Sequence, residues 1–220
     1  MEHKNQWILT TTLFISLGLA ACGSQSVLSQ AEAQAQTTTK TSTTSKAQTT
    51  SYFETSDLTA TYDESTASKI SLQGTTATAS GEGVTVNGST VEITKAGTYI
   101  VEGTASKVQL KVAAGKEDEV QIVFKNATLK NTEAPLLVDT AKKVILTIAD
   151  GTKNEVADES TSTVKGAIYS DSDLTINGKG SLTVTGAASN AIKSKDGIRI
   201  VDATITTTAK KHGIAANDFV

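Results

Sequence analysis

The 220-residue sequence is poor in the residues that many kinds of functional site require. It contains one Cys, one Pro, one Met and two His, and only 4% of its residues are aromatic. A single Cys excludes an intramolecular disulfide and a Cys-based zinc cluster, and two His are too few for a His-rich metal centre. The net charge of −3 lacks the basic footprint of nucleic-acid binding, so we expect no nucleic-acid partner.

The first 21 residues are typical of a removable export signal. Lys4 gives a positively charged start, and residues 8–20 form an apolar run too short to span a membrane. The run ends in the tetrapeptide Leu-Ala-Ala-Cys22, which resembles a bacterial lipobox. The resemblance implies lipidation of Cys22 and anchoring to the extracellular side of the bacterial cell membrane, at the cell surface. The alternative is a secretory signal followed by a Cys without this role.

The rest of the chain divides by composition into a linker and an all-β part. Residues 22–56 are rich in Thr and Ser without a periodic apolar face, which predicts a flexible tether. Beyond residue 57, short runs alternate apolar and polar residues between Gly, Asn and Asp, as strands with one buried face do. We expect an N-terminal cap and entry strands over residues 57–106, and repeated strands over residues 107–220.

The all-β part contains an internal repeat of about 22 to 24 residues. Pairs of apolar residues recur at nearly constant spacing, with one longer interval over the polar residues 150–163, which we interpret as an inserted loop. A second apolar position lies six residues before the first member of most of these pairs. The first set begins at Val120, Val144, Leu174, Ile198 and Val220, and the second is Val138, Ile168, Ile192 and Ile214.

This repeat predicts a right-handed, single-stranded parallel β-helix, in which each apolar column stacks on itself from rung to rung. Leucine-rich repeats have a similar length, but their signature is absent, and a β-sandwich gives no reason for recurring columns. A narrow aliphatic interior would account for the scarcity of aromatic residues and Pro. Because Val220 falls inside an expected strand, we interpret the sequence as a C-terminally truncated fragment.

Acidic residues gather at the turns before the repeated apolar pairs. Asp171, Asp173, Asp196 and Asp218 would lie within one or two rungs of one another in stacked turns. Stacked carboxylates repel unless a cation lies between them, and Ca²⁺ accepts Asp and turn carbonyl oxygens in flexible geometry. These residues are therefore candidate calcium ligands. The alternative is that Asp occurs here because turns favour it.

Basic residues gather in the late repeats. Lys193, Lys195 and Arg199, with Tyr169 as the only aromatic residue on the mapped rungs, are candidates for binding an anionic polysaccharide through its carboxylates. The alternative is a solvated charged face.

Several motifs together resemble a known family. Residues 83–88 (GVTVNG), 94–100 (TKAGTYI), 120–127 (VQIVFKNA), 166–170 (GAIYS) and 173–176 (DLTI) resemble the bacterial carbohydrate-binding domain-containing lipoproteins related to a clostridial cellulose- and pectin-binding protein. The resemblance implies a pectate-lyase-like right-handed parallel β-helix, bound calcium, and binding of acidic plant polysaccharide without cleavage.

These observations suggest three alternative functions. The leading hypothesis is a non-catalytic, lipid-anchored protein that binds a polysaccharide such as polygalacturonate through calcium and charged residues. The first alternative is a calcium-dependent pectate lyase, in which Arg199 or a Lys is the base. The second is a structural adhesin or wall spacer that binds no sugar.

Overall fold

The computed structural model describes residues 52–220, which form one short helix and seventeen strands. The predicted signal peptide, Cys22 and all but the last few residues of the predicted tether lie outside the described residues. Within residues 52–220, no helix has the length and apolar character needed to cross a membrane. The elements are α1 Thr55–Leu58, β1 Ser68–Gly74, β2 Thr76–Ser80, β3 Val84–Asn87, β4 Thr90–Ile93, β5 Gly97–Ser106, β6 Gln109–Ala113, β7 Glu119–Asn131, β8 Leu136–Thr140, β9 Lys143–Ile148, β10 Lys153–Asp158, β11 Gly166–Ser170, β12 Asp173–Asn177, β13 Ser181–Gly186, β14 Asn190–Ser194, β15 Ile198–Val201, β16 Thr204–Ala209 and β17 Ile214–Ala215.

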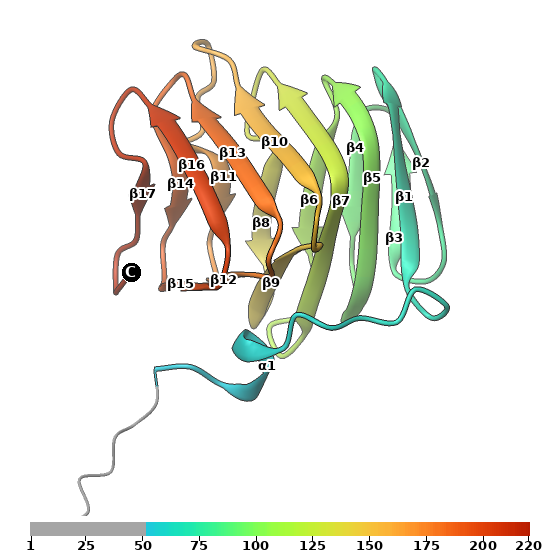
Figure 1. The fold of residues 1–220 in the computed structure, drawn as a ribbon. Helices are drawn as coiled ribbons and strands as arrows, with labels where there is room; N and C mark the ends of the chain where they lie inside the picture. Colours follow the sequence, from blue (N-terminus) through green and yellow to red (C-terminus); the bar gives the residue numbers. More distant parts are fainter. Residues whose placement is uncertain (1–51) are drawn as a thin grey trace, which may run out of the picture. The chain divides into compact units, whose positions relative to one another are not determined.

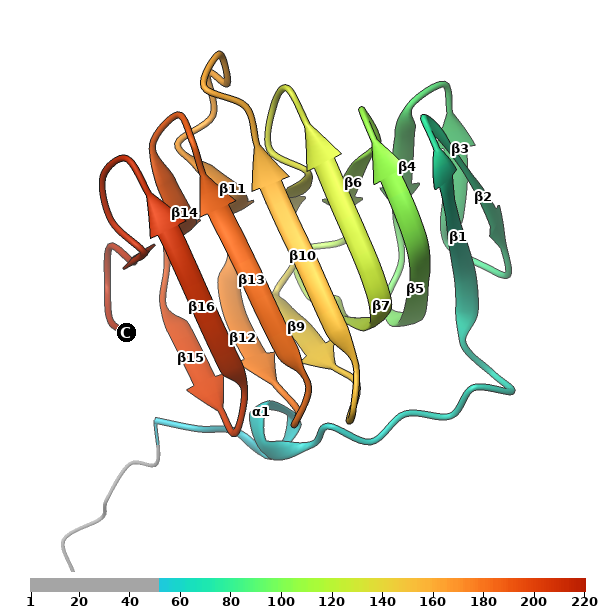
Figure 2. The ribbon, with the colours of Figure 1, turned by 45° about the horizontal axis from the view of Figure 1, so that its top comes forward.

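The strands form two mixed sheets, shown in Figures 1 and 2. The ten-stranded larger sheet contains the path β15-β12-β9-β7-β10-β13-β16, with β5 and then β1 and β2 joined to it at β7. The seven-stranded smaller sheet runs β17-β14-β11-β8-β6-β4-β3. Pairing is parallel from β4 and β5 onward, whereas β1–β2 and β3–β4 are antiparallel.

The predicted fold class is therefore wrong beyond its all-β character. A single-stranded parallel β-helix of the pectate-lyase type predicts parallel pairing, whereas both sheets here are mixed and neither closes into a barrel within residues 52–220. The cause lies in two tight turns, where Gly74 and Gly88 adopt positive φ angles of 66° and 61°. Gln73 pairs with Thr76 and Asn87 pairs with Thr90, so the two-residue loops are Gly74-Thr75 and Gly88-Ser89, each with Gly first, and each joins an antiparallel pair.

The repeat did predict the register of the parallel strands. Val120 on β7 pairs with Val144 on β9, which pairs with Leu174 on β12, which in turn pairs with Ile198 on β15. In the smaller sheet Ile168, Ile192 and Ile214 lie opposite one another.

Two details of the predicted pattern are corrected. Ile168 pairs with Leu136, whereas the expected Val138 lies two residues further along β8, opposite Ser170. The expected inserted loop contains β10, whose Val156 is buried, and Val220 lies outside any strand.

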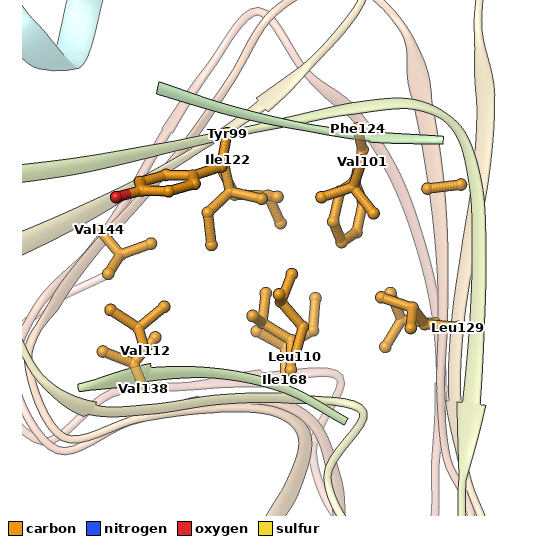
Figure 3. Close-up of a cluster of buried hydrophobic side chains, with 14 of the residues drawn as sticks. Tyr99, Val101, Leu110, Val112, Ile122, Phe124, Leu129, Val138, Val144 and Ile168 are labelled. Atoms are coloured by element: carbon orange, nitrogen blue, oxygen red, sulfur yellow. The ribbon is translucent and has the colours of Figure 1, made fainter. Parts of the chain in front are cut away.

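The inward side chains of the two sheets form one continuous apolar core. Figure 3 shows Ile122 and Phe124 of β7 facing Leu110 and Ile168 of the smaller sheet, with Leu129 at the side. Because successive side chains on a strand point to opposite faces, the inward column is apolar while its neighbours on each strand face outward. The alternating burial of β6 and β13 follows this rule.

The long strand β7 divides the larger sheet into two branches. Its first half, to Phe124, pairs with β9, and its second half, from Thr128, pairs with β10. Asn126, with φ 56°, lies between the halves. The branch that contains β9, β12 and β15 carries Lys143, Thr175 and Arg199, which are described below with the segment that covers them.

Candidate functional site

Three of the four predicted substrate-binding residues meet on the outer face of the smaller sheet. Tyr169 on β11 lies directly opposite Lys193 on β14, between inward-facing neighbours in each strand. Lys195 follows β14, and its Nζ lies 5.9 Å from the centre of the Tyr169 ring. The sequence places these groups together because Tyr169 and Lys193 hold the same position in successive repeats.

An acidic partner completes this group. Lys195 Nζ donates to Asp171 Oδ2 at 2.8 Å, which raises the pKa of Lys195. Burial raises the pKa of the half-buried Tyr169 hydroxyl, and the Asp171 charge raises it further. Lys193 donates to the Asn217 side-chain oxygen. We name Tyr169, Asp171, Lys193 and Lys195 the tyrosine–lysine face.

Arg199 lies with a different set of residues, on the outer face of β15. Its Nε donates to the Tyr52 carbonyl at 2.7 Å, and its Nη1 lies 3.1 Å from Asp173 Oδ2. The guanidinium carbon is 4.6 Å from the centre of the Phe219 ring. Arg199 and three aromatic residues, Tyr52, Phe53 and Phe219, line a groove of about 440 Å³. The structure therefore does not unite the predicted Arg with the predicted Lys residues.

The four predicted calcium ligands do not form a metal cluster. Asp171 and Asp173 have the cationic partners Lys195 and Arg199, and Asp173 also accepts the Gly197 N–H. Burial raises the pKa of Asp196, and the charges of Asp173 and Asp218 raise it further. Within residues 52–220, no group of three or more His, Cys, Asp or Glu side chains could hold a metal ion. This arrangement does not fit a calcium site, and calcium stays a prediction from the sequence.

A buried ionic cluster on the outer face of the larger sheet was not predicted. Residues 52–67, which we call the strap, run past β15, β12 and β9 toward β1, as the cyan segment of Figure 2 shows. Asp57 of the strap is fully buried, and its carboxylate lies 2.9 Å from the ammonium of Lys143, whose side chain is 2% exposed. The hydroxyl of Thr175 donates to the same carboxylate at 2.6 Å, and Arg199 Nε lies 3.5 Å from it.

The cluster is satisfied as a charged group. Burial opposes the ionisation of Asp57, but hydrogen bonds from Thr175, Lys143 and the Glu54 N–H outweigh it, so the pKa of Asp57 lies below its ordinary value. Burial likewise opposes the charge on Lys143, yet Glu54 and Asp57 together raise the pKa of this ammonium. Both groups are therefore ionised at neutral pH.

Amide side chains hold the strap beside this cluster. Asn177 Nδ2 donates to the carbonyls of Asp57 and Thr59 at 3.0 and 3.1 Å, and its Oδ1 accepts the Thr147 hydroxyl. Gln121 Nε2 donates to Thr147 Oγ1 at 3.0 Å. The repeat contained part of this signal, because the residues just before the apolar column are Glu119, Lys143 and Asp173, which pair across adjacent strands.

The fold and these surfaces define an all-β protein with repeated strands and polar outer faces. Residues 87–220 match the model of the carbohydrate-binding domain-containing protein family, and the chain belongs to this family. A carbohydrate-binding domain-containing protein of Acetivibrio thermocellus is 34% identical over 137 residues, which cover 58% of this chain and 48% of the relative. The chain thus spans about half the length of this curated relative.

A solved structure is also similar. It is a gadolinium derivative of the polysaccharide lyase-like protein from C. thermocellum, with a TM-score of 0.63 and 32% identity. The match covers 65% of this chain and 62% of that one.

Proposed function

We propose that the chain is a non-catalytic polysaccharide-binding protein of the bacterial cell surface. Its ligand is an acidic polysaccharide such as polygalacturonate, bound on the tyrosine–lysine face, and lipidated Cys22 attaches the chain to the membrane. Membership of the carbohydrate-binding domain-containing family supports the ligand class. The acidic character of the ligand and the anchor are inferred from residue chemistry and from the resemblance of the first 22 residues to a lipobox.

One observation carries the proposal, which is the grouping of two lysines with a half-buried aromatic ring on one face of the smaller sheet. Lys195 Nζ lies 5.9 Å from the Tyr169 ring centre, and Lys193 lies opposite Tyr169 on the next strand. An aromatic face packs against the apolar face of a sugar ring, while ammonium groups attract its carboxylate. Asp171 orients Lys195 through a hydrogen bond. Lys193 contacts the neutral side chain of Asn217, so its positive charge is not balanced by this partner.

Calcium takes no part in this binding mode. Asp171 and Asp173 are already neutralised by cations of the chain, so a bridging metal ion would have to displace Lys195 or Arg199. We therefore expect binding to persist in a chelator and to weaken as salt screens the Lys charges.

Retention on insoluble polygalacturonate tests the proposal. We expect Tyr169→Ala and Lys193→Ala each to reduce retention several-fold, and the Lys193→Ala/Lys195→Ala double variant to abolish it. Lys116→Ala removes an equally charged, exposed lysine from the loop between β6 and β7 and serves as the matched control. Equal retention of all the variants would refute the assignment to this face, and absence of retention by the unaltered chain would favour the wall-spacer alternative.

A lyase is the second candidate, because the similar solved structure is described as polysaccharide lyase-like. Incubation of the chain with polygalacturonate and calcium, monitored by absorbance of the unsaturated product, separates the two functions. We expect no product. Product formation that Arg199→Ala abolishes would replace the non-catalytic proposal.

A further inference from the structure

We propose that Lys143, Thr175 and Arg199 form a carboxylate-binding site that Asp57 of the strap occupies in this structure, and that the site receives a hexuronate carboxylate when the strap lifts. The class of ligand rests on the proposed function. The site itself rests on the contacts of Asp57 and lies on the larger sheet, apart from the tyrosine–lysine face.

The three groups project from adjacent strands of one rigid sheet. Thr175 and Arg199 pair directly between β12 and β15, and Lys143 lies on β9, the strand on the other side of β12. A hydroxyl at 2.6 Å, an ammonium at 2.9 Å and a guanidinium nitrogen at 3.5 Å surround one carboxylate. Charge-assisted contacts of this kind recognise carboxylates in general and do not depend on the backbone that carries them.

The charge balance of the site depends on the strap. The two carboxylates that Lys143 contacts among residues 52–220, Glu54 and Asp57, both belong to it. When the strap lifts, Lys143 loses both partners, whereas Arg199 retains Asp173. Once the strap lifts, Lys143 is an exposed cation without a carboxylate partner, so the site attracts a replacement anion.

Contacts around Asp57 are mostly polar, which makes the strap separable from the sheet. Asp57 is the one buried residue of α1, and Leu58 is 58% exposed. Tyr62 and Ala67 of the strap pack on a small apolar cluster closer to β1, and Tyr52 and Phe53 line a groove with Ile198 and Ile200 at the other end of the strap. Polar contacts can be exchanged for contacts with water, so the part of the strap around Asp57 can lift while Tyr62 stays packed.

Space for a sugar adjoins the site. A groove of about 450 Å³ lies between α1 and the sheet, with strap residues Thr55, Ser56 and Thr59 on one side and Thr98, Gln121 and Ile145 on the other, so lifting of the strap widens it. Gln121 and Ile145 belong to the same outward row as Thr175 and Arg199. The groove also contains Glu119, which is paired with Lys142 at 2.7 Å. A polysaccharide in this groove would present hydroxyls to Gln121 and one carboxylate toward Lys143.

Competition between Asp57 and a uronate has a measurable consequence. The apparent affinity for a ligand is proportional to the fraction of molecules in which its site is open. Asp57→Ala removes the competing carboxylate, so we expect it to increase the affinity for galacturonate by about tenfold or more, measured by titration calorimetry on the full chain. We expect galacturonate to raise the melting temperature of Asp57→Ala as well, and neutral galactose to have neither effect.

Three further variants make the result decisive. Asp57→Ala/Lys143→Met should lose the gain, and Asp63→Ala, which removes an exposed strap carboxylate bonded locally to Ser65, should behave like the unaltered chain. Asp57→Asn, which removes the charge and keeps the shape, replaces Asp57→Ala if that variant does not fold. A folded Asp57→Ala or Asp57→Asn chain with unchanged galacturonate affinity would overturn the inference and make Asp57 a permanent structural tie.

The same series separates this inference from the proposed function. An increase in galacturonate affinity that persists in Asp57→Ala/Tyr169→Ala supports the site formed by Lys143, Thr175 and Arg199, which we call the strap site, independently of binding at the tyrosine–lysine face. Conversely, retention on polygalacturonate that depends on Tyr169, without any gain from Asp57→Ala, overturns the strap site and leaves the proposed function in place.

Discussion

The outer faces of the two sheets carry similar ion pairs in opposite environments. On the larger sheet, Lys143 and Asp57 lie 2.9 Å apart beneath the strap, and their side chains are 2% and 0% exposed. On the smaller sheet, Lys195 and Asp171 lie 2.8 Å apart with side chains 53% and 32% exposed. The acid of the first pair comes from a distant segment, whereas that of the second comes from the neighbouring repeat.

This comparison separates two uses of a charged pair. A buried pair has lost its water, so removing one partner leaves an uncompensated charge. An exposed pair is stabilised by water as well as by its partner and contributes little to folding, which leaves both groups accessible to a ligand. The strap therefore buries the polar groups on the outer face of the larger sheet, whereas the tyrosine–lysine face of the smaller sheet remains exposed to solvent.

The largest effect is expected from Lys143→Met, which removes the main cationic partner of buried Asp57. We expect the free energy of unfolding to fall by about 2 to 3 kcal/mol, somewhat less than for a fully enclosed pair, because the strap can lift and rehydrate Asp57. Urea denaturation followed by circular dichroism measures this loss. A midpoint equal to that of the unaltered chain would show that the pair does not stabilise the fold.

Acid should produce a smaller, local effect at the strap. The pKa of Asp57 is lowered from its ordinary value of 3.8, so its contribution is full above pH 3.8 and is lost as the pH falls through the lower folded value. The pKa of Lys143 is raised from 10.5, so its contribution is full below pH 10.5 and is lost only as the pH rises beyond the higher folded value. Glu54, Lys143 and Arg199 are the charged groups that contact or adjoin the Asp57 carboxylate.

Hydrogen exchange of residues 54–62, corrected for the intrinsic rate at each pH, checks this expectation. Protection should be constant at neutral pH and should fall below pH 3.8, whereas Asp57→Asn should lack the transition. If the pH transition persists in Asp57→Asn, it arises from the titration of a group other than Asp57.

The smallest effect is expected from Lys195→Met on the exposed pair. Because water replaces the lost partner of Asp171, we expect no resolvable change in the urea midpoint. Retention on polygalacturonate should nevertheless decrease. A loss of stability as large as that of Lys143→Met would remove the distinction between the two faces.

Much of the strand pairing could be predicted from the sequence, because equivalent positions of successive repeats pair with each other. Val144, Leu174 and Ile198 recur at matching positions, and identical columns in adjacent strands place them opposite one another. The turns were less informative, since a Gly-Ser pair such as Gly88-Ser89 forms a hairpin loop only when the two flanking runs pair with each other. Both antiparallel pairs, β1–β2 and β3–β4, lie within residues 57–106, which were expected to form the cap and for which the repeat gives no register.

The candidate sites were predictable to different extents. Tyr169 and Lys193 come together because they belong to one column, so the sequence pattern was sufficient. Asp57 and Lys143 are 86 residues apart and share no repeat, and the strap crosses the sheet rather than extending it. No local pattern links the two residues.

Alternation and periodicity are local properties of the chain, so the order of the amino acids was enough to predict which residues face inward and which repeats pair. Which outward charges are buried depends on the folded arrangement. Burial depends on what covers a side chain, and here the cover is a distant segment held through Asp57, Asn177 and Thr175. The few cysteines, histidines and aromatic residues limited the available chemistry, and the path of the strap decided which of the remaining charged groups are accessible.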